Sequence, residues 1–466
     1  MNKKTFLVLL ISILFALSGC NIGPNYHRPQ VYVPTKFQEA NKHWKIAEPN
    51  DNCARGNWWE QFHDSNLNNL ESQLNVSNQN IASAKSNYLQ AKALIQEAKA
   101  GYFPTLNAIA QVTRSKQHSM NSDQASITNE RSLGLEASWI PDLFGGTRRS
   151  VESRVANAKA QEANLALVRL TEQATLAQLY YQLRGLKDNQ MILDQSVLDN
   201  QNLVKFAQNR YASGVDALSE VVQAESQLEN AQAQAINNGI LTAKTEHAIA
   251  VLLGQSPSAF TLAITGLGNV SPPNFPLVVP SLLLERRPDI ARAEREVEEA
   301  NAEIGVAKAA FFPVLTLSAS GDFQNSGKAY WLSLPALVWS LGPSMVETIL
   351  DGGLRKAQSQ AAWAAYEATV ANYRQTVLSS FQEVEDNLAQ LQILNAESKI
   401  EHKAVSNADT ALKIITNQYR TGTTTYADVM QAQISAMTIK KTEIDTDALR
   451  MSTAVGLVTA LGGGWS

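Results

Sequence analysis

Two hydrophobic patterns alternate along the 466-residue chain. In the long stretches 142–256 and 344–466, which lack proline, apolar residues recur every three or four positions, as expected of helices that bury one face. In two shorter stretches, near 104–140 and 313–342, apolar and polar residues alternate with a period of two, which is typical of strands. The pattern therefore predicts long helices combined with two hairpins of strands.

The proline-free stretches predict helices of unusual length. Proline in a helix interior costs about 3 kcal/mol, and none lies between Pro141 and Pro257 or after Pro343. We expect one helix from near Thr147 to about Ala212, where Gly214 offers a stop. At 1.5 Å per residue such a helix would reach roughly 100 Å.

Polar residues on the remaining faces of the first long helix have two interpretations. They lie either on an exterior bathed in water or on the wall of a wet interior. For any single residue the exterior is favoured. The residues in question are Gln173, Gln178, Gln182 and Asn189.

The alternating runs are about ten residues long, which is the length of a tilted membrane strand. The chain holds two pairs of these runs. The first pair is joined across a polar stretch near Ser119–Asn129 and the second across one near Gln324–Lys328. A soluble hairpin with one buried face is the alternative for any single run. Four strands cannot close on themselves, and each unpaired backbone group in lipid costs several kcal/mol, so we expect the chain to oligomerise. Four aromatic residues could mark the headgroup level: Trp139, Tyr330, Trp331 and Trp339.

The chain repeats itself at an offset of about 208 residues. Ala98–Pro104 returns as Ala307–Pro313, and Leu143-Phe144-Gly145-Gly146 returns as Leu350-Asp351-Gly352-Gly353. Further matches keep the same order along both halves. They are Tyr211, Gly214, Val221, Gln223 and Ala224 with Tyr419, Gly422, Val429, Gln431 and Ala432. The sequence is therefore two copies of one unit.

The amino terminus reads as a secretion signal over residues 1–19. Lys3 and Lys4 precede an apolar run, Phe6–Leu17, that is shorter than the roughly 20 residues a transmembrane helix needs. Leu17-Ser18-Gly19-Cys20 resembles the bacterial lipobox, which implies acylation of Cys20 as the first mature residue. Asn21 follows this cysteine, and in lipoproteins that the segment resembles such a residue favours transport to the outer membrane. Cys53 then has no partner for an intrachain disulfide.

The charged and catalytic residue types exclude several functions. A net charge of −4 supplies no basic field for nucleic acid. The six histidines are scattered without metal-binding spacing, and no phosphate-cradling glycine loop opens a helix. We therefore expect that the protein is not an enzyme and has no cofactor and no metal site.

Several motifs resemble the TolC family of outer-membrane channel-tunnels, in its lipoprotein branch of NodT type that serves resistance-nodulation-division efflux pumps. The resemblance covers nearly the whole mature chain. The motifs are Gly23-Pro24-Asn25-Tyr26, Arg28-Pro29, Trp58-Trp59 with Phe62, Asp64, Leu67 and Leu70, Asp142-Leu143-Phe144-Gly145, and Arg286-Arg287-Pro288-Asp289-Ile290.

The resemblance implies a mixed α/β membrane protein that forms a homotrimer. Three chains would build a 12-stranded outer-membrane β-barrel, with four strands from each, continued by a long periplasmic α-helical barrel. The mature chain would comprise a lipidated extended segment (20–56), a first repeat (57–254), a Pro-rich equatorial linker (255–281) and a second repeat (282–466). The amino-terminal segment, the linker and the carboxyl end would form a belt.

The function implied is a passive exit duct of a tripartite efflux system. A periplasmic adaptor would open its gate, and an inner-membrane pump, of resistance-nodulation-division type, would supply the energy. Two alternatives remain open. One is an ATP-driven type I export system, and the other is a coiled-coil lipoprotein spacer or adhesin without a pore.

The resemblance also implies the positions of the gate and of the adaptor contacts. Acidic, tyrosine and hydroxyl residues near the helix tips would close the duct: Glu220, Asp428, Ser219, Tyr211 and Tyr419. The adaptor would contact the turns at Gly214, Val215, Gly422 and Thr423. Each acid could instead simply favour the dipole at a helix start. Thr424 stands where some members have a gating arginine and Gln431 where they have a second aspartate, so we expect a looser closure.

Overall fold

The computed structural model describes residues 22–31, 56–118, 125–268, 270–273, 286–325 and 334–463. Cys20, Cys53, Tyr330 and Trp331 lie outside the described residues. The chain divides into two compact units. Unit 1 comprises Met1–Gln30, Asn87–Glu162 and Arg292–Arg374. Unit 2 comprises Val31–Ser86, Ala163–Ala291 and Gln375–Ser466. Each unit takes segments from both sequence copies.

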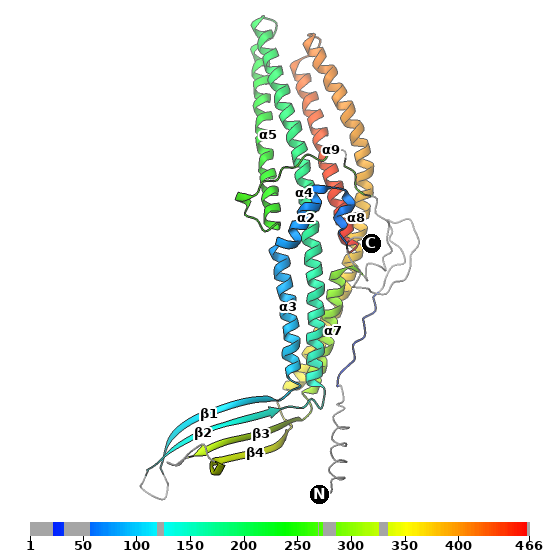
Figure 1. Ribbon diagram of the computed structural model, residues 1–466. Helices are drawn as coiled ribbons and strands as arrows, with labels where there is room; N and C mark the ends of the chain where they lie inside the picture. Colours follow the sequence, from blue (N-terminus) through cyan, green and yellow to red (C-terminus); the bar gives the residue numbers. More distant parts are fainter. Residues whose placement is uncertain are drawn as a thin grey trace. The chain divides into compact units, whose positions relative to one another are not determined.

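The helices come in pairs of equal length (Figure 1). α3 and α7 have 22 residues each, α4 and α8 have 67, and α5 and α9 have 35. Their bounds, with the unpaired α2, are Ser65–Ser77 (α2), Gln79–Ala100 (α3), Gly146–Ala212 (α4), Leu218–Leu252 (α5), Pro288–Ala309 (α7), Leu354–Arg420 (α8) and Tyr426–Ala460 (α9). Three 3₁₀ turns complete the described helical segments: Trp58–Phe62 (η1), Pro257–Ala259 (η2) and Leu334–Ala336 (η3).

The long helices α4 and α8 begin at carboxylates that cap them. The two oxygens of Asp142 accept the backbone N–H groups of Thr147 and Arg148, at 3.1 and 2.8 Å. Asp351 accepts the N–H groups of Gly353 and Arg355 at 2.9 and 3.3 Å. The first backbone N–H groups of a helix have no partner inside the helix, so these bonds satisfy them. The two Gly-Gly steps therefore mark helix starts in both copies.

Four antiparallel strands in unit 1 form one sheet in the order β1-β2-β3-β4. The strands are Thr105–His118 (β1), Ala125–Trp139 (β2), Val314–Asn325 (β3) and Leu337–Val346 (β4). The sequence pattern predicts a polar connector over residues 119–129. This prediction is wrong in part, because Ala125–Asn129 belongs to β2. The ladder continues through these polar residues, with Ser115 opposite Thr128 and their hydroxyls 2.7 Å apart.

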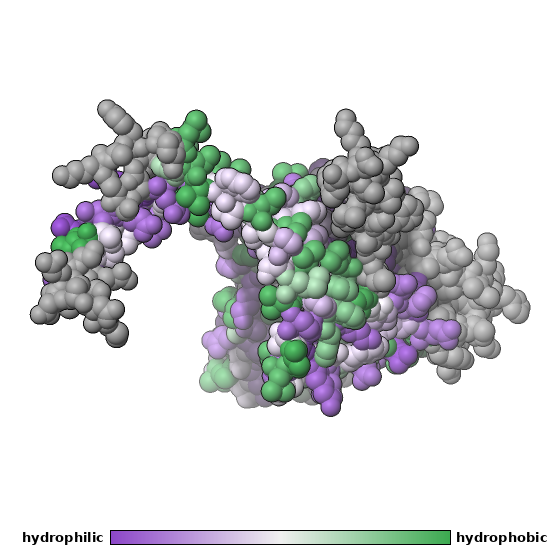
Figure 2. Space-filling model, turned by 90° about the horizontal axis from the view of Figure 1, so that it is seen from below, coloured by the Kyte–Doolittle hydropathy of each residue, from purple (hydrophilic) through white to green (hydrophobic). Residues whose placement is uncertain are grey.

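One face of the sheet is apolar across all four strands. The register places Ala108 opposite Leu135, and Ala319 opposite both Ala137 and Leu341. The opposite face is mainly polar, with hydroxyls, carboxylates and glycines in register, and it also carries Ile109 and Val338. Large side chains of the apolar face are exposed: Leu106 67%, Val112 78%, Leu135 53%, Trp339 72%, Leu341 78% and Met345 61%. Figure 2 shows green hydrophobic patches beside purple hydrophilic ones on the arm that the sheet forms.

Residues 22–30 form an extended strap that contacts helices of unit 1. Arg149 of α4 is buried and donates hydrogen bonds to the carbonyls of Ile22 and Gly23 and to the side chain of Asn25. Gly23 has a φ of +103°, and a Cβ there would lie 2.6 Å from the Cα of Gly305 on α7. Only glycine suits both the backbone conformation and the close approach. The strap thereby ties α4 to α7.

The main core of unit 2 gathers η1, α2, the linker near 260–270 and the carboxyl end of α9 around α4. Arg184 of α4 holds the linker by donating to the carbonyls of Gly266 and Leu267, and it pairs with Asp64 at 2.6 Å. Glu71 of α2 is fully buried, and its carboxyl has no hydrogen-bond partner in the part of the chain that the structure describes. Burial raises its pKa to about 9, so Glu71 is neutral at pH 7.

Of the helices with described residues, none combines the length and the apolar composition that crossing a membrane would need.

Candidate functional site

The candidate site consists of the two helical hairpin tips of unit 2, seen at the same end of the long helices in Figure 1. Tip 1, residues 203–224, joins α4 to α5, and tip 2, residues 411–432, joins α8 to α9. Gly214 and Gly422 have φ values of +69° and +79°. The N–H of the following residue, Val215 or Thr423, bonds to the carbonyl five residues earlier at 3.0 or 2.9 Å. Both helices therefore end in the same left-handed glycine motif.

Tip 1 carries an ion pair across its turn. Arg210 donates from two nitrogens to the two carboxylate oxygens of Asp216, with a distance of 2.7 Å for Nη2–Oδ1. This pairing holds the pKa of Asp216 below its usual range. The guanidinium also lies over the rings of Phe206 and Tyr419, at 5.7 and 5.6 Å from their centroids. Arg210 thus connects the turn of tip 1 with a residue of tip 2.

Tyr419 of tip 2 inserts into tip 1. Its side chain is 1% exposed, and its ring lies 5.4 Å from that of Phe206 and 5.8 Å from that of Tyr426. The hydroxyl donates to Oε2 of Glu220 at 3.3 Å. Partial burial, followed by the charge of Asp216, raises the pKa of Glu220. The pKa of Tyr419 is also raised, chiefly by burial and then by Glu220, so its hydroxyl remains a donor.

The carboxylate of Asp428 in tip 2, unlike that of Glu220, bonds only within its own tip. Its Oδ2 accepts from the hydroxyls of Thr424 and Thr425 at 2.6 and 2.7 Å, and from the backbone N–H of Thr425 at 3.1 Å. In return Thr425 Oγ1 accepts the N–H of Asp428, which completes a capping box at the start of α9. The bonds from Thr424 and then Thr425 hold the pKa of Asp428 below its usual range. Within one chain it is therefore a helix-start carboxylate.

The structure separates the two tyrosines that the sequence treats as equivalent. Tyr419 meets an acid, whereas Tyr211 is 46% exposed and its hydroxyl has no hydrogen bond to any described residue. Ser219 is also exposed, and so is Val215 at the turn. Thr423 is exposed and donates to the carbonyl of Gln418 within its own turn. The single chain brings together Tyr419 and Glu220, and leaves the other predicted residues on the surface.

The sequence interpretation missed Arg210 and Asp216. It noted a missing arginine at Thr424, but the arginine at the tips comes from α4 of the other copy. A signal was present, because Arg210 and Asp216 flank Gly214 at a spacing that a tight turn brings together. Thr424 bonds to Asp428 instead, and Gln431 lies exposed on α9.

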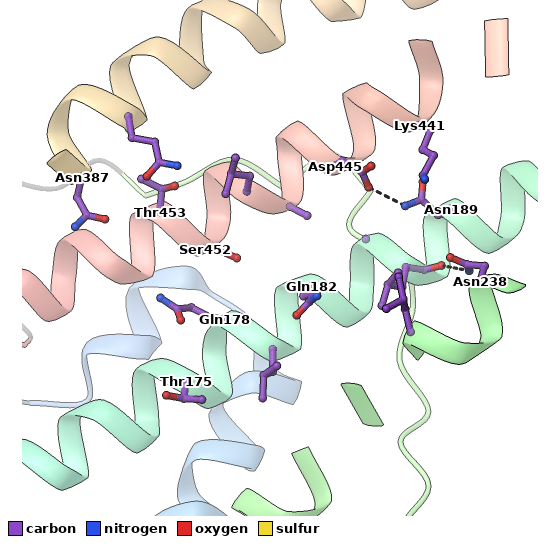
Figure 3. A pocket seen from close by; sticks show the side chains of 17 residues that line it. Thr175, Gln178, Gln182, Asn189, Asn238, Asn387, Lys441, Asp445, Ser452 and Thr453 are labelled. Atoms are coloured by element: carbon purple, nitrogen blue, oxygen red, sulfur yellow. Dashed lines mark hydrogen bonds between the residues drawn. The ribbon is translucent and has the colours of Figure 1, made fainter. Parts of the chain in front are cut away.

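Farther along the same helices, polar side chains line a hollow of about 630 Å³ (Figure 3). Gln178 and Gln182 of α4 and Ser452 of α9 point into it, and Asn189 donates to Asp445 at 2.9 Å. Gln178, Gln182 and Asn189 thus line a partly enclosed polar groove. Gln173 fits neither interpretation.

Gln173 is 6% exposed. It accepts from the Trp58 indole at 3.3 Å and donates to Asn75 at 2.8 Å. It is a satisfied core amide that links η1 and α2 to α4, not a residue of a wet wall.

Across the described residues, no three histidine, cysteine, aspartate or glutamate side chains gather as a metal site. The tips instead offer polar and ionic ties between helices, together with exposed apolar side chains. Such a constellation can hold two helical hairpins together or release them.

A family model described as outer membrane efflux protein matches residues 70–255 and again residues 279–463. The chain belongs to this family. The double match reflects the two sequence copies and confirms the resemblance drawn from the motifs. As an outer membrane efflux protein, the chain is the outer-membrane exit component of an efflux system, and the family is one of ducts, not enzymes.

Individual relatives match this outer membrane efflux protein over almost its whole length. The cation efflux system protein CusC of Escherichia coli O6:H1 is 27% identical and covers 98% of each chain. The pyoverdine export outer membrane protein OpmQ of Pseudomonas aeruginosa is 27% identical, covering 98% of this chain and 96% of its own. The solved structure of the outer-membrane channel OprN superposes with a TM-score of 0.85 at 27% identity, covering 96% of this chain and 100% of the other.

Proposed function

We propose that three copies of the chain close into one duct, whose 12-stranded barrel crosses the outer membrane. The observation that carries this proposal is the open sheet with its exposed apolar face. Neither the outer edge of β1 nor that of β4 has a partner strand among the described residues. Lipid tolerates no unpaired sheet edge, so β4 of one chain must pair with β1 of the next. The apolar face then meets lipid and the polar face lines the lumen.

The long helices α4, α5, α8 and α9 continue the duct into the periplasm as a helical barrel. The polar groove lined by Gln178, Gln182 and Ser452 supports this, because it is the wall expected of a water-filled passage. Relatives named for cation efflux and for pyoverdine export match this chain over almost its whole length, which fits a wall that is polar without a dedicated binding site.

The amino-terminal strap and the core around η1 take supporting roles. Cys20 carries the lipid anchor, and Arg149 fixes the strap at the carbonyls of Ile22 and Gly23, two and three residues after that cysteine. The core that joins η1, α2, the linker and the end of α9 forms the equatorial belt. In this proposal both features brace the helical wall.

Energy and partners come from outside the chain. A periplasmic adaptor contacts the exposed turns at Val215 and Thr423, and an inner-membrane pump of the resistance-nodulation-division type drives cargo through it. The exposure of both turns supports adaptor contact, because apolar Val215 is 64% exposed at the end of a long helical hairpin.

The tips form the gate in this proposal. Trimerisation turns Glu220 and Asp428 into rings of three carboxylates, which repel one another and favour opening unless hydrogen bonds hold the helices together. The bond from Tyr419 to Glu220 and the ion pair of Arg210 with Asp216 are the ties seen within one chain. Adaptor binding at the turns would break such ties.

A pore-free spacer or adhesin is disfavoured by the sheet. A protein that uses only helix length has no need for a four-stranded sheet whose apolar side chains, such as Val112 and Leu341, are 78% exposed. Its purified form would also be purely helical by circular dichroism. An ATP-driven exporter would use the same duct, and an adjoining ATPase gene would favour it.

Conductance of the purified full-length protein in planar bilayers tests the proposal. We expect wild-type trimers to conduct weakly, and Glu220→Ala with Asp428→Ala to raise the conductance several-fold, because carboxylates that anchor ties are lost. Glu229→Ala, which removes an exposed carboxylate nine residues farther along α5, is the matched control and should leave conductance unchanged.

No conductance from the double variant, together with a monomer in native mass spectrometry, would reject the duct. A trimer whose conductance ignores both substitutions would keep the duct and reject the gate at the tips.

A further inference from the structure

The charged residues of the sheet are sorted by face. The lysines and arginines of the described strands are Arg114 and Lys116 on β1 and Arg131 on β2. Each stands an even number of residues from Ala108 or Leu135 on its own strand, so all of them lie on the apolar face, and all are exposed. The face that the proposed duct turns toward lipid therefore carries every lysine and arginine of the described strands.

The acidic residues of the same strands lie on the other face. They are Glu130 and Glu136 on β2 and Asp322 on β3, at positions that alternate with those of the apolar face. Strand β4, which would pair with β1 of the next chain in the proposed trimer, has no charged residue. Among the described strands, the outward cations therefore have no counter-charge on their own face of the sheet.

The three cations are also neighbours. Arg114 and Lys116 follow one another on the same face of β1, about 7 Å apart along the strand. Arg131 is opposite Val112 in the ladder, which makes it the diagonal neighbour of Arg114 at roughly 8 Å. Like charges held this close repel one another unless an anion lies between them. We call these three residues the basic cluster.

The basic cluster lies at the end of the sheet remote from the helices (Figure 1). Leu106 opens the apolar face at the end of β1 that follows α3, and Arg114 stands about 26 Å farther along the strand. At the usual strand tilt of about 40°, Arg114 and Lys116 lie roughly 20 and 25 Å of membrane thickness away from Leu106. The apolar band of membrane barrels is about 25 Å tall, and lysine or arginine is tolerated near its limits. Because the proposed duct continues into the periplasm at the helices, the cluster belongs to the outer leaflet.

We infer that the basic cluster binds the phosphate groups of an anionic lipid in the outer leaflet of the outer membrane. The inference rests on the proposed barrel, because only there does the apolar face meet lipid. The guanidinium and ammonium groups donate to phosphate oxygens, and a guanidinium can bond two of these oxygens at once. The acyl chains pack on the adjacent apolar side chains, among them Ala110 and Val112. A soluble anion would gain nothing from this apolar surface, so a lipid is the occupant that fits both parts.

Lipid binding to the purified full-length protein, followed by native mass spectrometry in a neutral detergent, tests the inference. The probes are diphosphoryl lipid A, which carries two phosphate groups, and zwitterionic phosphatidylethanolamine. We expect wild-type trimers to bind the phosphorylated lipid tighter by roughly tenfold or more, because each cation near an anionic lipid surface adds to the attraction. The variant Arg114→Gln with Lys116→Gln and Arg131→Gln should lose most of this preference.

The matched control removes three exposed cations from the helices. Lys85→Gln with Lys205→Gln and Lys413→Gln changes the charge of the chain by the same amount on α3, α4 and α8, and it should keep the preference of wild type. Inorganic phosphate at the same concentration as the lipid should not displace it. Full displacement would show a site for any phosphate and overturn the assignment to a lipid.

The same spectra separate failure of this inference from failure of the duct. A wild-type trimer without preference for the phosphorylated lipid, or an equal preference in the cluster variant, would overturn the inference and leave the duct standing. A wild-type protein that is monomeric would reject the proposed function itself. If the cluster variant does not assemble, the three single substitutions replace it, and each should lower the preference in part. Single variants that all bind as wild type does would overturn the inference.

Discussion

Tip 1 and tip 2 share their turn and differ in what secures the helix that follows it. Both turns use a glycine with positive φ and the same backbone bond to the carbonyl five residues earlier. At the start of α5, Ala217 offers no side-chain cap, and stability comes from Arg210 and Asp216. At the start of α9, Thr425 and Asp428 form a capping box. Duplication kept the backbone requirement and let the side chains diverge.

The difference assigns the tips separate tasks. Charged groups of tip 1 contact tip 2. Arg210 lies over the ring of Tyr419, and Glu220 accepts a hydrogen bond from the Tyr419 hydroxyl. Tip 2 uses Asp428 locally and leaves one carboxylate oxygen for another partner. One tip is thus organised around a contact inside the chain, and the other keeps an unused acceptor on its surface.

The largest effect is expected from Arg210→Gln, which gives tip 1 the neutral residue of tip 2. Asp216 and Glu220 would lose their counter-charge, so we expect amide hydrogen exchange in peptides covering 206–222 to accelerate on the order of tenfold. Gln418→Ala, at the equivalent position of tip 2, is the control and should leave exchange at tip 1 unchanged. Unaltered exchange in Arg210→Gln would show that the ion pair does not hold the turn.

Removing the helix cap of α9 and adding one to α5 should reverse part of the difference in local stability between the two tips. Thr425→Ala removes the cap of α9 at about 1 kcal/mol, which is roughly fivefold in local opening. Ala217→Thr, with Glu220 three residues later, should create a capping box at α5 and slow exchange there by a similar factor. Peptide-resolved hydrogen exchange of both full-length variants checks this. The comparison fails if Ala217→Thr accelerates exchange in α5.

Acidification should affect the tips with opposite signs and in separate pH ranges. The pKa of Glu220 is raised from 4.5 by burial, so the folded form holds its proton more tightly and tip 1 gains stability as the pH falls through that pKa. This gain in stability is complete below about pH 4.5, the ordinary pKa of the carboxyl. The pKa of Asp428 is lowered from 3.8, so its contribution is present above 3.8 and lost only as the pH falls through the lower value.

Hydrogen exchange between pH 7 and 4.5, corrected for the intrinsic rate, should therefore slow at tip 1 and stay constant at tip 2. Glu220→Gln should abolish the response at tip 1. A response confined to tip 2 in this range would contradict the assignment of the two carboxylates.

The smallest effect is expected from Tyr419→Phe, which removes one hydroxyl. Its hydrogen bond favours the ionised form of Glu220 and lowers the pKa of that carboxyl, so its loss should raise the pKa further. The pH profile of exchange at tip 1 should shift to higher pH. Tyr211→Phe is the matched control, because Tyr211 has no bond to Glu220, and an equal shift in both variants would rule out a specific bond.

The helices could be predicted closely, and the strands less so. Proline spacing and one glycine placed the first long helix from near Thr147 to Ala212, and α4 runs from Gly146 to Ala212. The start of β2 was misplaced because Ser126, Ile127 and Thr128 look like a polar connector. Their strand conformation depends on pairing with the opposite end of β1, as in Ile127 with Lys116. Such pairing is not local, so composition alone does not reveal it.

The candidate site shows the same division. The sequence places the acid Glu220 and the tyrosine Tyr419 at the tips, and in the structure the Tyr419 hydroxyl donates to Glu220. Their role in a gate stays a prediction. Gln173 was misjudged because an amide on a helix face looks the same in sequence whether it faces water or the Trp58 indole. The proposed duct likewise depends on sheet edges, which exist only after four strands from two distant segments have paired.

By itself the sequence determined the duplication, the lengths of the helices and the positions of their turns. These features follow from local rules, because proline, left-handed glycine and hydrophobic period act within a few residues. Only the tertiary structure decided which copy of each repeated residue is buried. Tyr211 and Tyr419 occupy equivalent positions and differ only in the neighbours that packing brings to them, 46% exposed in one case and 1% in the other.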